Sequence, residues 1–127
     1  MTQVILVRND GALILLEAAG RDDPHSRGLV SALGGPQVDG LSPHDTARVY
    51  LQDFTNLPHA DDSLVYWRRY PEEQTHIFLL HQVDGSQLRE LWGDRLVVIH
   101  NDAEARRLNL VPALRRAVSD YYLELRK

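Results

Sequence analysis

The chain has no cysteine, a single methionine in 127 residues and no long apolar run. Without cysteine, disulfides, thiolate metal ligands and cysteine nucleophiles are excluded. No apolar run approaches the roughly 18–20 residues that span a bilayer, so we expect no membrane segment. The amino terminus has no basic start before its short apolar stretch, so we expect no signal peptide and a cytoplasmic location.

Positive charge is also limited, because 14 Lys and Arg residues face 18 Asp and Glu residues and give a formal net charge of −4. The basic residues occur singly or in pairs instead of forming a stripe, so nucleic-acid binding is not expected. The hydrophobic fraction of 43% and the charged fraction of 25% are ordinary for a globular protein. The length predicts one domain over residues 1–127 with one sizeable core.

Turn residues and apolar runs predict that the first part of the chain forms β-strands. Residues 3–17 form two apolar runs around Asn9-Asp10-Gly11, a pattern typical of a β-hairpin. Residues 18–28 are polar and rich in turn formers, so we expect a loop there. Residues 29–33 then favour a short strand that ends at a glycine pair.

The next element carries strong helix-start signals. Ser42 is a good N-cap, Pro43 suits the first helical position, and Asp45 can satisfy free amides and the helix dipole. Apolar residues follow at helical spacing. We expect this helix to stop near Asn56, because asparagine tolerates the left-handed conformation and a proline follows two residues later.

The second half predicts more strands and a closing helix. We expect strands over 63–70, 74–84 and 94–102, a turn at 84–86 with a short helical piece over 87–91, and a helix opened by Pro112. This order of elements favours an α/β (α+β) fold in which helices pack against a mixed sheet.

Residues 34–57, GGPQVDGLSPHDTARVYLQDFTNL, resemble the Nudix box of hydrolases that cleave nucleoside diphosphates linked to another moiety. The segment aligns without a gap, and its scaffold positions match the family's types: Gly34, Gly35, Gly40 and Ser42. The elements around the segment match the family's architecture along nearly the whole chain. The resemblance therefore implies a Nudix-like α-β-α sandwich with a mixed, partly antiparallel sheet.

The positions that carry the family's chemistry do not match. The family's arginine falls on Val49, and its glutamates fall on Leu41, Tyr50, Asp53 and Phe54. Residues three and four apart share a helix face, so positions 50, 53 and 54 should point together. In the family such glutamates bind divalent metal, which implies Mg²⁺ or Mn²⁺ here if the chain is active, and otherwise no cofactor. Asp53 is the candidate metal ligand, although one carboxylate holds a hydrated magnesium ion only weakly.

Charged residues away from the family's glutamate positions could complete such a site. The resemblance allows Glu90 as an auxiliary ligand or base, against the alternative of a solvated surface charge. Asp45 is better explained as a cap, because about 12 Å of helix separate it from Asp53. Basic residues that could face the cleft are Arg21, Arg27 and Arg68, and Arg27 is our candidate for ligand binding.

Aromatic side chains form a second candidate set. Tyr50 and Phe54, with Tyr66 and Trp67, could stack on the base of a ligand. The alternative is that they pack in the core. If Tyr50 and Phe54 stay exposed, they line a ligand pocket or a partner-binding patch, and if they pack inward, the cleft is filled.

The favoured interpretation is a Nudix-like domain with little or no catalysis that binds a nucleotide-like small molecule or a protein partner. The alternative is an active divalent-metal-dependent pyrophosphohydrolase that uses Asp53 with carboxylates from outside the motif. A homodimer that buries the altered helix face is a third interpretation. Fold resemblance alone does not decide among them, because function depends on the site.

Overall fold

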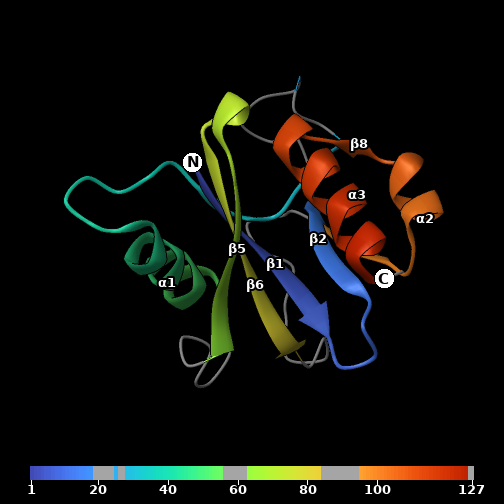
Figure 1. Cartoon of the computed structure of the whole chain (residues 1–127), viewed down its shortest axis with the longest axis horizontal. Coiled ribbons are helices and arrows are strands. Elements are labelled where there is room, and N and C mark those ends of the chain that lie inside the picture. The colour runs from blue at the N-terminus through green and yellow to red at the C-terminus, as the bar shows by residue number, and fades with distance from the viewer. Residues whose placement is uncertain (19–24, 26–27, 56–62, 84–94, 126–127) are drawn as a thin grey trace.

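The computed structural model describes residues 1–18, 25, 28–55, 63–83 and 95–125, without the side chain of Phe54. Three layers are visible in Figure 1: α1 (Pro43–Phe54) lies on one side of a β-sheet, and α2 (Asp102–Arg106) and α3 (Pro112–Leu125) lie on the other. The expected α-β-α sandwich is therefore confirmed. No helix in the described ranges has the length and apolarity needed to cross a membrane.

The described strands form one eight-stranded mixed sheet. Its main path runs β5-β6-β1-β2-β3-β8, while β4 pairs with β1 and β7 pairs with β2. The strands have these bounds: β1 Thr2–Arg8, β2 Leu13–Glu17, β3 Leu29–Ser31, β4 Leu33–Gly35, β5 Leu64–Tyr70, β6 Thr75–Val83, β7 Arg95–Ile99 and β8 Asn109–Leu110. β1 pairs in parallel with β6, and β3 with β8, while the other pairs are antiparallel.

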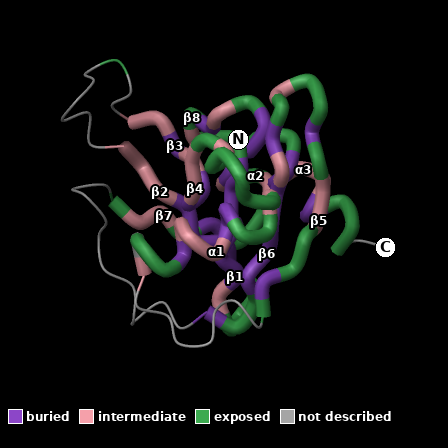
Figure 2. The backbone as a smooth tube through the Cα atoms, turned by 90° about the vertical axis from the view of Figure 1, so that its left-hand side faces the viewer, coloured by how far each residue is buried: buried purple, intermediate pink, exposed green. Residues whose placement is uncertain are grey.

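The two faces of the sheet bury separate apolar clusters. One cluster includes Leu114 and Val118 of α3, and the other includes Ala47 and Leu51 of α1. Buried residues follow β1 and β6 through the middle of the molecule in Figure 2, because these strands are covered on both faces. The two clusters hold α1 and α3 at opposite sides of the central strands.

The predicted start of α1 is confirmed, and the helix ends close to the predicted stop near Asn56. Ser42 is the N-cap, and its hydroxyl accepts a hydrogen bond from the backbone N–H of Asp45. The helix ends at Phe54, and Thr55 caps it in an extended conformation with its hydroxyl donating to the carbonyl of Leu51 at 2.6 Å. A side-chain bond therefore closes the helix at Thr55, ahead of Asn56, which lies outside the described residues.

Other expected elements are confirmed with small shifts in their ends. The hairpin forms β1 and β2, with Gly11 at φ 92° in its turn, and the predicted strand over 29–33 divides at Ala32 into β3 and β4. The structure adds α2, β8 and a 3₁₀ turn, η3 (Pro71–Glu73), which the sequence patterns did not indicate. Most of the expected loop over 18–28, the turn at 84–86 and the helical piece over 87–91 lie outside the described residues.

Candidate functional site

The loop between β4 and α1 is fixed by a small polar network. The amide of Gln37 donates to the Leu41 carbonyl at 2.7 Å and to the Thr46 hydroxyl at 2.8 Å. Its oxygen accepts from the hydroxyl of Thr2 at 2.9 Å, and both threonines are fully buried. These bonds join the loop to β1 and to the first turn of α1. The segment that resembles the Nudix box therefore has a defined backbone at its beginning.

Tyr50 lies at the middle of α1 with its ring turned toward the glycine pair. Its hydroxyl donates to the carbonyl of Pro36 at 2.7 Å, and the residue is half-buried. A Cβ atom added to Gly35 would come within 2.8 Å of the Tyr50 hydroxyl oxygen. The phenol therefore packs directly on the glycine turn, at a position where the family resemblance implies a metal-binding carboxylate.

The residues present do not fit a divalent cation at this helix face. Asp53 is exposed, Leu41 is 37% exposed, and position 50 carries a phenol already bonded to a backbone carbonyl. Such cations take several oxygen ligands, with carboxylates as the usual charged members. Among the described residues, no group of three or more His, Asp or Glu side chains is placed to hold a metal ion.

Gly34, Gly40 and the N-cap residue Ser42 have structural roles in the turn and at the start of α1. Gly34 has φ 142°, and an added Cβ would collide with the backbone carbonyl of Thr2 in the neighbouring strand. Gly40 has φ 83°, which a residue with a side chain rarely adopts. With Ser42 at the N-cap, these positions stabilise the turn and the helix.

The candidate stacking set is divided between the two faces of the sheet. Tyr66 lies edge-on to Phe78, a member of the α1-side cluster, with ring centroids 5.1 Å apart. Trp67 lies edge-on to Tyr121 of α3 at 6.1 Å, so it belongs to the opposite face. The two aromatic residues from β5 thus do not form one platform, because their rings lie on opposite faces of the sheet at a point where the β5–β6 register shifts.

Arg68 also lies on the α3 side, which corrects its expected place in the cleft beside α1. Its guanidinium forms ion pairs with Glu124 and, at 3.6 Å, with Asp120 of α3. Arg21, Arg27, Glu90 and the side chain of Phe54 lie outside the part of the chain that the structure describes, so their expected roles stay predictions.

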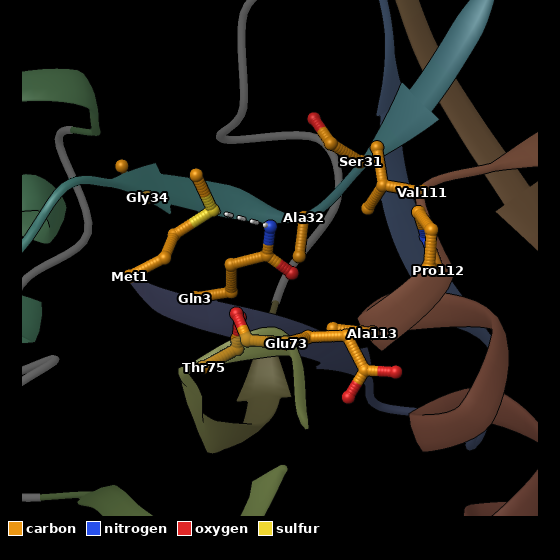
Figure 3. Close-up of a pocket in the computed structure, with 11 residues that line it drawn as sticks. Met1, Gln3, Ser31, Ala32, Gly34, Glu73, Thr75, Val111, Pro112 and Ala113 are labelled. Carbon is orange, nitrogen blue, oxygen red and sulfur yellow. Dashed lines mark hydrogen bonds between the residues drawn. The ribbon is translucent and has the colours of Figure 1, made fainter. Parts of the chain in front are cut away.

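A pocket that the sequence patterns did not indicate lies on the other side of the glycine pair. It has a volume of about 390 Å³ and is formed where β1, the β3–β4 segment, the end of η3 and the start of α3 meet (Figure 3). Most of its lining is small or apolar, including Ala32, Gly34, Val111, Pro112 and Ala113. Its residues come from four distant segments, so no local motif could reveal it.

Gln3 and Thr75 are the buried polar residues in the described lining of this pocket, and Gln3 is the one with an unpaired side-chain atom. The residue is 4% exposed, and its amide nitrogen donates to the Met1 sulfur at 3.4 Å. Its amide oxygen has no hydrogen-bond partner among the described residues. In Figure 3 the amide lies between Met1 and the wall formed by Ala32. A buried acceptor of this kind is costly unless a ligand or water satisfies it.

Glu73 is the charged side chain among the pocket-lining residues. Its carboxylate lies 3.0 Å from the guanidinium of Arg116, on the first turns of α3, and its side chain is 20% exposed. The same guanidinium nitrogen lies 3.0 Å from Glu72, and the guanidinium stacks over the ring of Tyr70. These contacts bring the positive charge of Arg116 against two carboxylates and fix Glu73 beside the helix.

Two solved structures have the same fold as this chain. The solution structure of the E. coli ORF135 protein matches with a TM-score of 0.60 and 20% identity, over 98% of this chain and 88% of that one. A Nudix hydrolase from M. smegmatis, RenU, matches with a TM-score of 0.58 and 14% identity, over 98% of this chain and 82% of that one. The chain therefore has a Nudix-like fold.

No protein-family model matches the sequence, and no curated protein does either. The similarity is thus one of structure at low identity. It establishes the arrangement of the sheet and helices, and function has to be argued from the residues of the site.

Proposed function

We propose that this chain is a Nudix-like domain that binds a nucleotide-like small molecule through its heteroaromatic part, without the metal-dependent hydrolysis that the fold supports elsewhere. The observation that carries the proposal is the contact of Tyr50 with the glycine turn, 2.7 Å from hydroxyl to the Pro36 carbonyl. The phenol fills space beside Gly35 and adds no charge. Metal-assisted hydrolysis depends on ligands that fix the ion and activate water, and this side chain supplies neither.

The pocket beside Gln3 supports the binding part of the proposal. Its volume of about 390 Å³ lies within the usual range for small-molecule sites, and its lining is mostly apolar with few polar groups. It shares the glycine pair with the turn against which Tyr50 packs. The ligand site and the altered helix face are thus adjacent but separate.

A protein partner is the second candidate, and the loop before α1 favours it. Val38 and Leu41 are 36% and 37% exposed, and the loop projects away from the sheet beyond α1 in Figure 1. Bonds from Gln37 to the Leu41 carbonyl and to Thr46 fix the loop in place. Apolar side chains on an ordered projection lose little conformational entropy when a partner covers them.

The experiment is a calorimetric titration of the protein with Mg²⁺ and Mn²⁺, followed by a hydrolysis assay on a panel of nucleoside diphosphate derivatives. The proposal expects ligand binding that needs no metal and no metal-dependent hydrolysis. Asp53→Ala is the matched variant, because it removes the carboxylate that remains at the family's glutamate positions. Hydrolysis that requires metal and disappears in Asp53→Ala would establish the alternative, an active hydrolase that draws further ligands from elsewhere in the chain.

A further inference from the structure

β7 is an edge strand of the sheet. β2 pairs with β1 through Leu13 and Ile14, and the same two residues also pair with β7. A strand has only two hydrogen-bonding edges, so β1 and β7 lie on opposite sides of β2, and Figure 2 shows β7 next to β2. Among the described residues, no strand pairs with the outer edge of β7. The backbone N–H and C=O groups on that edge can therefore pair with a strand of another chain.

β5, at one end of the sheet's main path, is protected against such pairing, and β7 is not. The β5–β6 register shifts between Tyr66 and Arg68, and a second arginine, Arg69, follows. Bulges and charged side chains are the usual devices that keep an edge strand from joining another sheet. β7 pairs with β2 in continuous register over all five residues, and after Arg95 it is entirely aliphatic. The outer edge of β7 is thus regular, apolar and unprotected.

Both faces of β7 present aliphatic side chains at the margin of the sheet. Ile99 belongs to the cluster on the α3 side and Val97 packs against it, whereas Leu96 packs against the cluster on the α1 side. Val98 is 36% exposed, and Leu96 and Val97 are half-buried. A strand added beside β7 would cover these side chains without burying a charge.

Charged side chains at the two ends of β7 complement each other. Arg95 begins the strand, shares the α3 side with Val97 by alternation, and is 69% exposed. Its guanidinium pairs with Glu17 of β2 through a single carboxylate oxygen, which leaves other N–H donors available. Glu104 lies beyond the other end of the strand, where its carboxylate accepts the backbone N–H of His100 at 2.6 Å. An antiparallel partner strand would bring these two ends together.

Glu104 is the carboxylate at this end that is best placed to accept a second cation. Its ion-pair partner among the described residues is the ring of His100 at 3.3 Å, which is charged only when protonated, and its side chain is 42% exposed. Two other ion pairs near this end hold their own charges: Arg8 with Asp10, and Arg106 with Asp102.

The alternation of backbone groups limits where a two-fold axis can cross β7. In an antiparallel pair, two residues opposite each other point their N–H and C=O groups either both toward the other strand or both away from it. The axis must therefore pass through a residue and not between two. An axis at Val97 sets Leu96 opposite Val98 of the second copy and Arg95 opposite Ile99, so all five residues pair. Any other centre shortens the overlap.

We infer that two copies of this chain join along β7, antiparallel about a two-fold axis at Val97, so that their sheets become continuous. Arg95 of each copy then lies beside Glu104 of the other. Because both copies use the same surface, the assembly closes at two chains, and the protected edge at β5 does not extend it. The inference goes beyond the proposed function and does not depend on it, since β7 contributes no residue to the pocket beside Gln3. It also differs from a dimer that buries the α1 face.

Sedimentation equilibrium of the unmodified chain is the first test. Between about 10 and about 500 µM, the average mass should rise from the 14.5 kDa of one chain toward twice that value and no further. A mass that stays at that of one chain, or that passes that of two, overturns the inference. This measurement needs no substitution, so it decides even if a variant fails to fold.

An introduced thiol then tests the strand and its register, because the chain has no cysteine of its own. At the axis, position 97 faces its own copy with Cα atoms about 4.5–5.5 Å apart, a distance that a disulfide bridges. Val97→Cys, treated with oxidised glutathione, should give a covalent dimer on a denaturing gel. Val65→Cys is the control, since it places a thiol at a 49% exposed position of β5, and it should stay a single chain. If Val97→Cys cross-links no more than Val65→Cys, pairing along β7 is wrong.

A charge reversal tests the contact between the strand ends. Arg95→Glu places a carboxylate beside Glu104 of the second copy and should raise the dissociation constant of the dimer at least about fivefold, with a smaller effect in high salt. Arg69→Glu makes the same charge change at an exposed position of β5 and should leave the constant unchanged. An unchanged constant in Arg95→Glu, or an equal rise in Arg69→Glu, overturns the contact. Failure of the chain to bind any ligand would overturn the proposed function alone.

Discussion

Replacing Tyr50 tests whether its position serves folding. In Tyr50→Phe, the hydroxyl that bonds the Pro36 carbonyl at 2.7 Å is lost, and the free energy of unfolding should fall by about 0.5–1.5 kcal/mol. Tyr50→Ala also removes a half-buried ring. Burial of a whole aromatic side chain is worth about 3–5 kcal/mol, so half of it with the hydrogen bond gives a loss of about 2–4 kcal/mol.

The assay is urea unfolding followed by far-ultraviolet circular dichroism, with Asp53→Ala as the control. Asp53 is an exposed residue on the same helix, so its replacement should change stability by less than about 0.5 kcal/mol. The loss of stability should be largest in Tyr50→Ala, smaller in Tyr50→Phe and smallest in the control Asp53→Ala. If both Tyr50 variants are as stable as the wild type, the phenol does not support the glycine turn and the structural role of this position is refuted.

Three further predictions concern caps, buried hydroxyls and acid stability. Ser42→Ala should destabilise the protein by about 0.5–2 kcal/mol in urea unfolding, because the hydrogen bond from the Asp45 N–H to the N-cap side chain is lost. Ser42→Asp should retain most of the wild-type stability, because aspartate is also a good N-cap. Tyr122→Phe should unfold at equal or higher urea concentration, since the buried hydroxyl has no partner among the described residues. Burial also raises the pKa of Tyr122 to about 12. The contribution of the neutral phenol to the free energy of unfolding is therefore present below pH 10 and is lost as pH rises through about 12. A difference spectrum at alkaline pH should show this titration, and the Phe variant should lack it. The Arg8 guanidinium beside Asp10 holds the pKa of that carboxyl well below its ordinary 3.8. The contribution of this ion pair to stability is therefore present above pH 3.8 and is lost as pH falls through the lowered pKa. Carboxyl NMR titration should find Asp10 ionised below pH 3.8, and an ordinary titration there would contradict the ion pair.

The sequence predicted the elements whose signals are local. The hairpin turn with Gly11 and the start of α1 at Ser42 and Pro43 are set by residues next to each other, and both form where expected. α2 and β8 were missed because they are only five and two residues long. Their conformation is stabilised by packing on α3 and pairing with β3, which no short pattern encodes.

The candidate site was predictable only in part, because some of its contacts join residues that are far apart in the sequence. The absence of glutamates at positions 41, 50 and 54 is visible in the sequence, but the acceptor for Tyr50 is not, because the Pro36 carbonyl lies 14 residues away. The pocket could not be predicted from the sequence, because nothing in the pattern around Gln3 distinguishes it from an ordinary polar residue of a strand. The pocket becomes visible only when Glu73 and the start of α3 are placed beside Gln3.

The most direct test of the central claim is a Mn²⁺ titration of the wild-type protein and Asp53→Ala, monitored by paramagnetic broadening of backbone NMR signals. If the α1 face is kept for folding, residues of α1 and the glycine turn should show no saturable broadening, and the two proteins should behave alike. Saturable broadening centred on Asp53, lost in the variant, would contradict the account and identify the α1 face as a metal site.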